Sequence, residues 1–143
     1  MRVKVNKISP DAKIPEYAHE GDSGMDLYAD EDAVIGPFER KAIGTGLKIE
    51  IPLGYEAQVR PKSGLALNNG ITVLNTPGTV DSGYRGEVKV ILANISKEAY
   101  KVEKGKKIAQ LVFAKVENAE IKEVDELSDT SRKEGGFGST GLK

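Results

Sequence analysis

The sequence contains no cysteine and only one histidine. The lack of cysteine excludes disulfide bonds, thiolate zinc sites and a cysteine nucleophile. The single histidine, His19, excludes a histidine-based metal cluster and argues against a Ser-His-Asp triad. We therefore expect His19 to be a surface-loop residue.

The chain also lacks an excess of one charge and a long apolar run. Its 21 basic and 22 acidic residues give a net charge of -1, which argues against a general nucleic-acid or membrane binder. A few local lysines and arginines still suffice to bind one small anion. No stretch is long enough to cross a bilayer, and residues 1–6 lack the apolar run of a signal peptide. We expect a soluble cytoplasmic protein with no nucleic-acid or membrane partner.

Short alternating runs, separated by Gly, Pro, Asn and Asp, dominate the 143 residues. In one run Tyr55, Ala57 and Val59 share a face, and polar residues occupy the other. Similar runs recur along the chain, at residues 46–51, 71–74, 87–95, 100–103 and 107–116. This period-2 pattern is typical of antiparallel sheets with one buried face. It predicts one all-β domain, a jelly-roll-like β-barrel or sandwich.

Helical signal is confined to residues 63–70, where we expect one short turn with Ser63 as its N-cap and Gly70 as its terminator. The preceding strand leads into Arg-Pro-Lys-Ser-Gly-Leu-Ala, residues 60–66. Backbone N–H groups at the start of a helical turn, with Lys62 beside them, would form an anion site. The alternative is a plain strand-to-turn corner capped by Ser63.

A polar loop at residues 78–86 reads Gly-Thr-Val-Asp-Ser-Gly-Tyr-Arg-Gly and is flanked by apolar strands. Asp81, Tyr84 and Arg85 crowd into five positions and offer a base, an aromatic wall and a cation. The alternative is an ordinary turn, since Asp-Ser-Gly is common turn chemistry.

Two further segments each place one polar side chain in an apolar setting. Asp26 enters a strand within residues 23–29, and Gln110 lies within the apolar run of residues 105–111. Read alone, each side chain answers a local hydrogen-bond need of the backbone.

The last fifteen residues differ in kind, because the apolar spacing stops at Asp129. One interpretation is a flexible tail. The other rests on Phe137, which lies among three glycines with Ser139 and Thr140 just behind it. That mix supplies a stacking ring, exposed N–H groups and hydroxyls, which is what a nucleotide with phosphates needs. We predict a β domain over residues 1–128 and a mobile C-terminal arm over residues 129–143.

Five segments in order resemble the five motifs of the trimeric dUTPase family, from about Asp22 to Gly141: Ser-Gly-Met-Asp-Leu-Tyr-Ala, Pro-Lys-Ser-Gly-Leu-Ala, Pro-Gly-Thr-Val-Asp-Ser-Gly-Tyr-Arg-Gly, Ile-Ala-Gln-Leu and Arg-Lys-Glu-Gly-Gly-Phe-Gly-Ser-Thr-Gly. The resemblance implies a jelly-roll homotrimer that hydrolyses dUTP to dUMP and pyrophosphate. This reaction keeps uracil out of DNA and supplies dUMP for thymidylate synthesis. The implied cofactor is Mg²⁺, held by the triphosphate and water with no direct protein ligand. Each active site is shared between subunits, with the C-terminal arm lent across.

The same resemblance implies roles at the nucleoside end of dUTP. Asp81 contacts the deoxyribose 3′-OH and orients the water that attacks the α-phosphorus. Tyr84 packs under the sugar and leaves no room for a 2′-OH. Uracil is recognised by hairpin backbone around Asn75, Gly78 and Thr79. The narrow hairpin also excludes the thymine methyl group.

At the phosphate end, the resemblance implies direct contacts from Lys62, Ser63, Gly64, Gln110, Arg132, Ser139 and Thr140. Phe137 stacks on the uracil, and Asp26 and Arg85 are supporting residues. Lys62 stands where the family usually has arginine, so the charge is kept but the planar bidentate fork is lost. Arg60 can compensate for the lost fork only if the strand stays regular through Pro61.

Two rival functions share the expected fold. A dCTP deaminase needs a glutamate inside the strand after the catalytic loop, whereas the strand at residues 87–92 has no acid beyond Glu87. A non-catalytic nucleotide-binding module would not need Asp81 beside a water site. Ammonia release from dCTP would indicate the first rival, and tight binding of dUTP analogues without pyrophosphate release would indicate the second.

Overall fold

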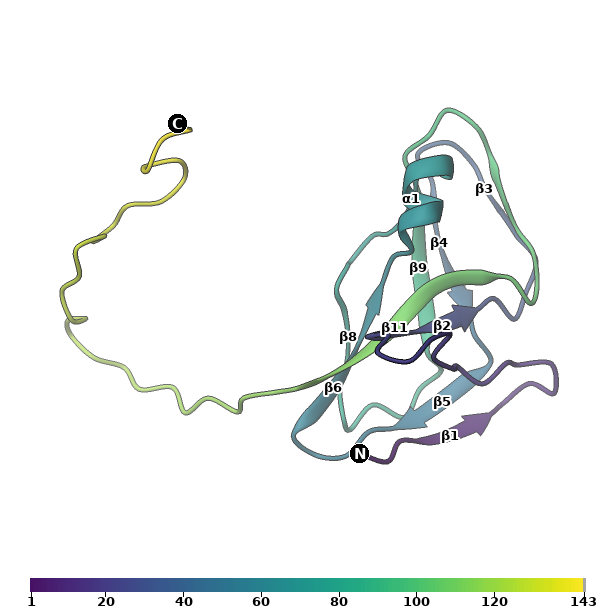
Figure 1. Cartoon of the computed structure of the whole chain (residues 1–143), viewed down its shortest axis with the longest axis horizontal. Helices are drawn as coiled ribbons and strands as arrows, with labels where there is room; N and C mark the ends of the chain where they lie inside the picture. The colour runs from purple at the N-terminus through teal and green to yellow at the C-terminus, as the bar shows by residue number, and fades with distance from the viewer. Residues whose placement is uncertain (143) are drawn as a thin grey trace.

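The computed structural model describes residues 1–142, and within them nearly all regular structure is β (Figure 1). The elements in chain order are β1 (Lys4–Lys7), β2 (Gly24–Tyr28), β3 (Ala33–Ile35), β4 (Arg40–Gly44), β5 (Leu47–Glu50), β6 (Tyr55–Arg60), α1 (Ser63–Asn69), β7 (Ile71–Val73), β8 (Gly78–Val80), β9 (Lys89–Asn94), β10 (Tyr100–Val102) and β11 (Lys107–Lys115). The all-β prediction with one short helical turn is confirmed.

The strands pair antiparallel in four sheets. The largest has the order β2-β11-β6-β8, and a second has the order β4-β9-β7. Two-stranded ribbons, β1-β5 and β10-β3, complete the body. β11 is central to the largest sheet, because it pairs with β2 on one side and β6 on the other. Segments far apart in the sequence therefore meet along β11.

The core follows the alternation of the strands. Ala57 and Val59 on β6 are buried, and Tyr55 packs against them from the same face, as predicted. Val90 and Leu92 on β9 alternate into the same core and are fully buried. One continuous apolar cluster joins the sheets, which is how a domain of this size buries its hydrophobic faces.

The helix prediction was right in place and wrong in one cap. Gly70 ends α1 in the left-handed conformation, with φ of 64° and its N–H donating to Ala66 O. Ser63 is the first helical residue and not the N-cap. The N-cap position falls on Lys62, whose backbone is extended after Pro61 and whose side chain makes no capping bond. The helix therefore begins one residue earlier than the cap prediction required.

Several short strands were not predicted. β1 is exposed at all four residues, so it shows no apolar alternation and depends on backbone pairing with β5. β3 has only three residues, and β8 occupies the start of the segment predicted to be a loop. His19 is exposed in a bend, as predicted, and its N–H donates to Asp22 Oδ2 at 2.8 Å.

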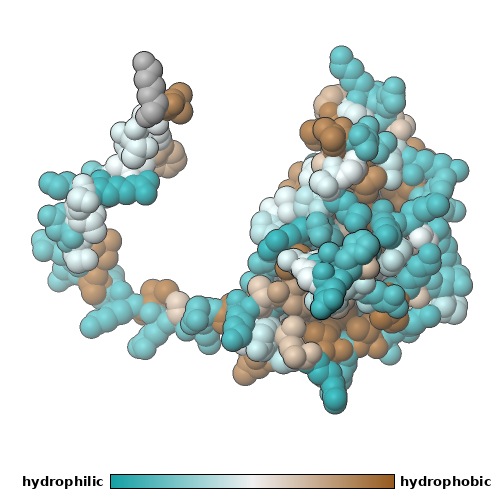
Figure 2. All heavy atoms as spheres, in the orientation of Figure 1, coloured by the Kyte–Doolittle hydropathy of each residue, from teal (hydrophilic) through white to brown (hydrophobic). Residues whose placement is uncertain are grey.

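The C-terminal segment leaves the body after β11. Residues 116–142 form no strand or helix, and Figure 1 shows them running away from the sheets. Apolar side chains along this segment are uncovered, with Ile121 and Leu127 each 88% exposed. Figure 2 shows hydrophobic and hydrophilic groups interspersed along the segment. Across residues 1–142, no helix has the length and apolar character that crossing a membrane requires.

Candidate active site

One row of polar side chains crosses the largest sheet. Asp26 on β2 is paired with Gln110 on β11, and Gln110 is paired in turn with Arg60 on β6. The side-chain amide of Gln110 donates to Pro61 O at 2.9 Å. Gly24 leaves room for this arrangement, since a Cβ there would collide with Gln110 Oε1 and lie 3.1 Å from its Cδ. The predicted residues Asp26 and Gln110 therefore share a site with the end of β6.

Asp26 carries the strongest electrostatic interactions of this row. Its buried carboxylate accepts a hydrogen bond from Lys62 Nζ at Oδ1 and another from Lys107 Nζ at Oδ2, the latter at 2.9 Å. Burial disfavours the charged carboxylate, but the bonds from the two lysines outweigh it, and the pKa of Asp26 lies below its ordinary value. The same bond raises the pKa of Lys107. The cluster of Asp26, Lys62 and Lys107 has a net charge of +1.

The start of α1 adjoins this cluster. Ser63 and Gly64 are exposed and directly follow Lys62. The first helical bond runs from Ala66 N to Lys62 O at 3.0 Å, so the N–H groups of residues 63–65 precede the helical ladder. A lysine ammonium, a hydroxyl and backbone donors are thus grouped where the sequence predicted phosphate contacts.

Asp81 lies elsewhere, in the turn that follows β8. Its carbonyl accepts from Tyr84 N at 3.1 Å, and Tyr84 Oη donates to Glu87 O at 2.9 Å. Arg85 Nη1 donates to Ser82 O at 2.7 Å, which closes the turn from the other side. Arg85 Nη2 also lies 3.3 Å from an oxygen of Glu50. The turn is held by side-chain bonds to its own carbonyls, and its carboxylate is left exposed.

A pocket of about 530 Å³ opens beside the Asp81 carboxylate, lined by Leu53, Gly54, Tyr55, Glu56, Asp81, Ser82, Val116 and Asn118. None of the predicted phosphate-binding residues lines it. Within residues 1–142, Asp81 forms no ion pair. Its carboxylate is therefore available to a ligand or a water molecule.

The predicted uracil hairpin has a different connection. β7 pairs with β9, whereas β8 pairs with β6, so the segment between them is a turn that links two sheets. Gly78 is buried against Asn75, and a Cβ at Gly78 would lie 3.2 Å from Asn75 Nδ2. Thr79 is exposed on β8. The hairpin description was wrong in its pairing, because these two strands take different partners.

A single chain does not bring the Asp81 turn to the phosphate cluster. Asp81 follows Val80, which is paired with Ala57 near the start of β6, whereas Gln110 is paired with Arg60 at its end. Three residues of strand separate those two levels, which is about 10 Å. Lys62 lies beyond Arg60 at one end of β6, and Asp81 lies beyond Val80 toward the other end. The distance between Lys62 and Asp81 along the sheet is therefore larger still.

The arm residues are not brought to either place. Arg132 Nε donates to Gly135 O at 2.7 Å, and Gly135 N donates back to Arg132 O at 3.0 Å, which makes a self-contained turn. A second turn places Ser139 N on Gly136 O at 3.0 Å. Phe137 is fully exposed, with a φ of 49°. Figure 1 shows this segment well apart from the sheets.

Sequence reasoning assigned no role to Lys107 or Glu50. Lys107 immediately precedes the Ile-Ala-Gln-Leu motif, but the register of β11 against β2 shifts between Lys107 and Ala109. Strict alternation therefore cannot show which side chain Lys107 meets. Glu50 shows no motif at all, and its contact with Arg85 joins residues 35 positions apart.

No group of three or more His, Cys, Asp or Glu side chains in residues 1–142 is arranged to hold a metal ion. A protein-only metal cage is thus not part of the described site. Mg²⁺ commonly keeps several waters and binds through one or two carboxylates plus substrate phosphates. Asp81 is exposed and forms no ion pair within residues 1–142, so one carboxylate is accessible to such an ion.

Comparison with known proteins gives a consistent result. A model of the dUTPase family matches residues 10–141. A deoxyuridine 5′-triphosphate nucleotidohydrolase of Alkaliphilus metalliredigens is 61% identical over 141 residues, covering 99% of this chain and 98% of that protein. The corresponding protein of Nautilia profundicola is 58% identical, with 99% of each chain covered.

Solved structures agree with the sequence matches. The dUTPase of Staphylococcus bacteriophage 80alpha, solved with dUPNHPP, is 30% identical and superposes with a TM-score of 0.91 over 99% of both chains. A variant of the dUTPase from phage phi11 of S. aureus, described as coordinating a structural Mg(II) ion, is 25% identical with a TM-score of 0.84, covering 90% of this chain and all of that one.

Proposed function

The chain belongs to the dUTPase family, and from that premise we propose how its residues hydrolyse dUTP to dUMP and pyrophosphate. As a dUTP diphosphatase it must activate a water molecule against the α-phosphorus. The observation that carries the proposal is the exposed, unpaired carboxylate of Asp81 beside an open pocket. A carboxylate in that position accepts a proton from water and aims the water oxygen at phosphorus. The new bond joins that oxygen to the α-phosphorus, and pyrophosphate leaves with the bridging oxygen.

Sugar selection is proposed for Tyr84. Its hydroxyl is fixed on Glu87 O, and the turn around it is closed by Arg85. Because the ring is tethered at its hydroxyl, it cannot shift freely to admit an added 2′-hydroxyl. Asn75, Gly78 and Thr79 supply the neighbouring turn for the uracil edge, and Phe137 stacks on the base when the arm closes.

Phosphate binding is proposed for the residues around the start of α1. Lys62, Ser63, Gly64 and Gln110 lie at one end of β6, where a net positive cluster meets free backbone donors. Arg132, Ser139 and Thr140 complete the charge from the arm, which positions the substrate and excludes water. When bound, Mg²⁺ would neutralise part of the phosphate charge. Asp26 supports the site through its ion pair with Lys62.

Active sites shared between copies are proposed from the same geometry. Asp81 and Lys62 lie at opposite ends of β6 in one chain, and the arm runs away from both. This arrangement supports a site assembled from the Asp81 turn, the phosphate cluster and the arm of different copies. A homotrimer with three equivalent shared sites satisfies this requirement.

Replacing Asp81 tests the proposed chemistry. Asp81→Asn keeps the size of the side chain but removes the proton acceptor, so turnover of dUTP should fall by orders of magnitude. Glu56→Gln removes a carboxylate from the same pocket and serves as the matched control, with turnover expected near the parent value. Near-normal turnover by Asp81→Asn would remove Asp81 from the mechanism.

Mixing two inactive variants tests the shared site. Asp81→Asn chains still carry an intact arm, and chains that end before Arg132 still carry Asp81. Unfolding and refolding the two together should restore activity in about one quarter of the sites, since each of two positions is filled correctly half the time. Each variant refolded alone is the control. No recovery from mixtures shown to contain both chains would contradict a site built from different copies.

A further inference from the structure

Lys107 is the one charged contact of Asp26 that has no part in the proposed function. It begins β11, opposite Tyr28, and its ammonium lies 2.9 Å from Asp26 Oδ2. Lys62 occupies the other oxygen, Oδ1. The two lysines therefore bind the same buried carboxylate without competing for one atom.

The two lysines differ in how firmly their backbones are held. Lys107 is a strand residue within the sheet, whereas Lys62 lies at the junction between β6 and α1, after Pro61. Lys62 also lies next to Ser63 and the free N–H groups where phosphate is proposed to bind. Of the two, Lys62 is the one placed to exchange partners.

Such an exchange has an electrostatic cost that Lys107 reduces. The Asp26 side chain is only 11% exposed, and a buried carboxylate without a partner is strongly destabilising. If Lys62 turns toward a phosphate, Lys107 remains on Asp26 Oδ2 and keeps the carboxylate paired. Without Lys107, Lys62 would either have to stay paired with Asp26 or leave the Asp26 carboxylate with no partner.

We propose that Lys107 is a positioning residue that frees Lys62 to move from Asp26 to the substrate phosphates. This inference rests on the proposed phosphate role of Lys62. Lys107 touches no phosphate in this account and acts only through the shared carboxylate. We therefore expect Lys107 to affect binding of the triphosphate and not of the nucleoside.

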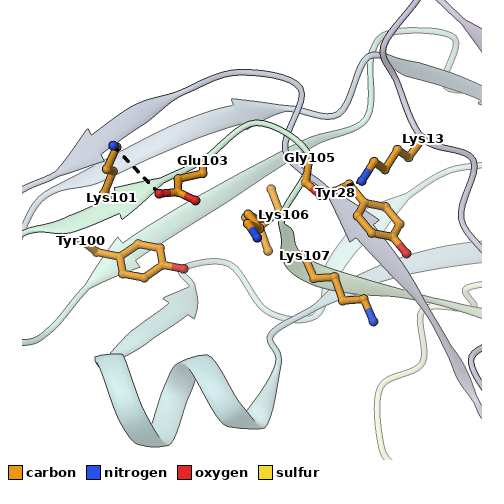
Figure 3. Close-up of a pocket in the computed structure, with 9 residues that line it drawn as sticks. Lys13, Tyr28, Tyr100, Lys101, Glu103, Gly105, Lys106 and Lys107 are labelled. Atoms are coloured by element: carbon orange, nitrogen blue, oxygen red, sulfur yellow. Dashed lines mark hydrogen bonds and ion pairs between the residues drawn. The ribbon is translucent and has the colours of Figure 1, made fainter.

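Lys106 provides a matched control. Within residues 1–142 it forms no ion pair. It lines a pocket of about 590 Å³ together with Tyr100, Lys101 and Lys107. In Figure 3 the side chain of Lys107 extends away from Tyr100 and Lys101, and Lys106 lies between them and Lys107. Lys106→Met removes the same charge from the next position but leaves Asp26 untouched.

The experiment measures binding of a non-hydrolysable dUTP analogue and inhibition by deoxyuridine. Lys107→Met should weaken analogue binding by about tenfold, with deoxyuridine inhibition unchanged and Lys107→Arg restoring the parent affinity. Lys106→Met should match the parent. In a Lys62→Met background, Lys107→Met should cause no further loss, because the lysine it acts through is gone.

Three outcomes would overturn the inference. Lys107→Met could bind the analogue as tightly as Lys106→Met does. It could weaken inhibition by deoxyuridine and binding of the analogue equally. In the Lys62→Met background, it could weaken analogue binding by its full factor. If Lys107→Met does not fold, Lys107→Gln takes its place in each comparison. Hydrolysis of dUTP by the parent protein is measured alongside, so failure of the proposed function is distinguished from failure of this inference.

Discussion

Asp26→Asn should destabilise the protein by an amount that can be worked out from its surroundings. An ion pair on the surface contributes about 0–1 kcal/mol, whereas breaking a fully buried pair costs about 3–5 kcal/mol. The Asp26 side chain is 11% exposed and that of Lys62 is 30% exposed, which lies between these limits. We expect a loss of about 2 kcal/mol at neutral pH, because asparagine keeps one acceptor but leaves two ammonium groups unneutralised.

The pH dependence of this loss gives a second, independent check. The pKa of Asp26 is lowered in the folded protein, so its stabilising contribution is fully present above the unfolded pKa of about 3.9. The contribution disappears as the pH falls through the lower folded pKa. The difference in stability between the parent and Asp26→Asn should therefore be constant from pH 7 to about pH 5 and shrink below about pH 4.

The assay is denaturant unfolding at fixed protein concentration, because association would make the midpoint concentration-dependent. Asp125→Asn, an exposed change in the C-terminal segment, is the control and should alter stability by less than about 0.5 kcal/mol. Equal stability of Asp26→Asn and the parent at pH 7, or a difference as large at pH 3 as at pH 7, would refute the reasoning.

Three other changes have defined outcomes. Glu50→Gln removes the carboxylate that lies 3.3 Å from Arg85, so the turn that holds Tyr84 should loosen. The ratio of kcat/KM for dUTP to kcat/KM for UTP should then fall severalfold. An unchanged ratio would contradict a role of Glu50 in sugar selection. Gly24→Ala forces the Gln110 side chain to rotate off Pro61 O; unfolding should show a loss of about 1 kcal/mol, and full retention of stability would show that the amide adapts at no cost. Deleting residues 132–143 should leave the unfolding midpoint unchanged, since no core side chain is lost, yet abolish most turnover; full activity of the shortened chain would make the arm a bystander.

The sequence predicted those parts of the fold that local patterning controls. β6 alternates apolar and polar residues over six positions, β9 is a mostly apolar run, and both fell within predicted runs. β1 could not be found in this way, because all four of its residues are exposed and it is held by backbone pairing with β5 and by the ion pair between Lys4 and Glu50. Ser63 was misplaced because capping depends on the φ and ψ of one junction residue, Lys62, which composition does not specify.

The residues of the candidate site also divide into those that local sequence patterns indicate and those that only the packing reveals. Motif order alone assigned Asp81, Gln110 and the arm to the candidate site, because it needs no knowledge of packing. Lys107 escaped notice, since its contact with Asp26 depends on a register shift between two strands distant in sequence. The wide separation of Asp81 from Lys62 also required the structure, because only the pairing of β6 with β8 and β11 reveals it.

Pyrophosphate release measured side by side with dUTP, dTTP, dCTP and UTP, each with Mg²⁺, tests the central claim most directly. We predict rapid release from dUTP alone, because the proposed uracil turn would exclude thymine and cytosine and Tyr84 would exclude the 2′-hydroxyl. No release from dUTP, or comparable release from UTP, would contradict it.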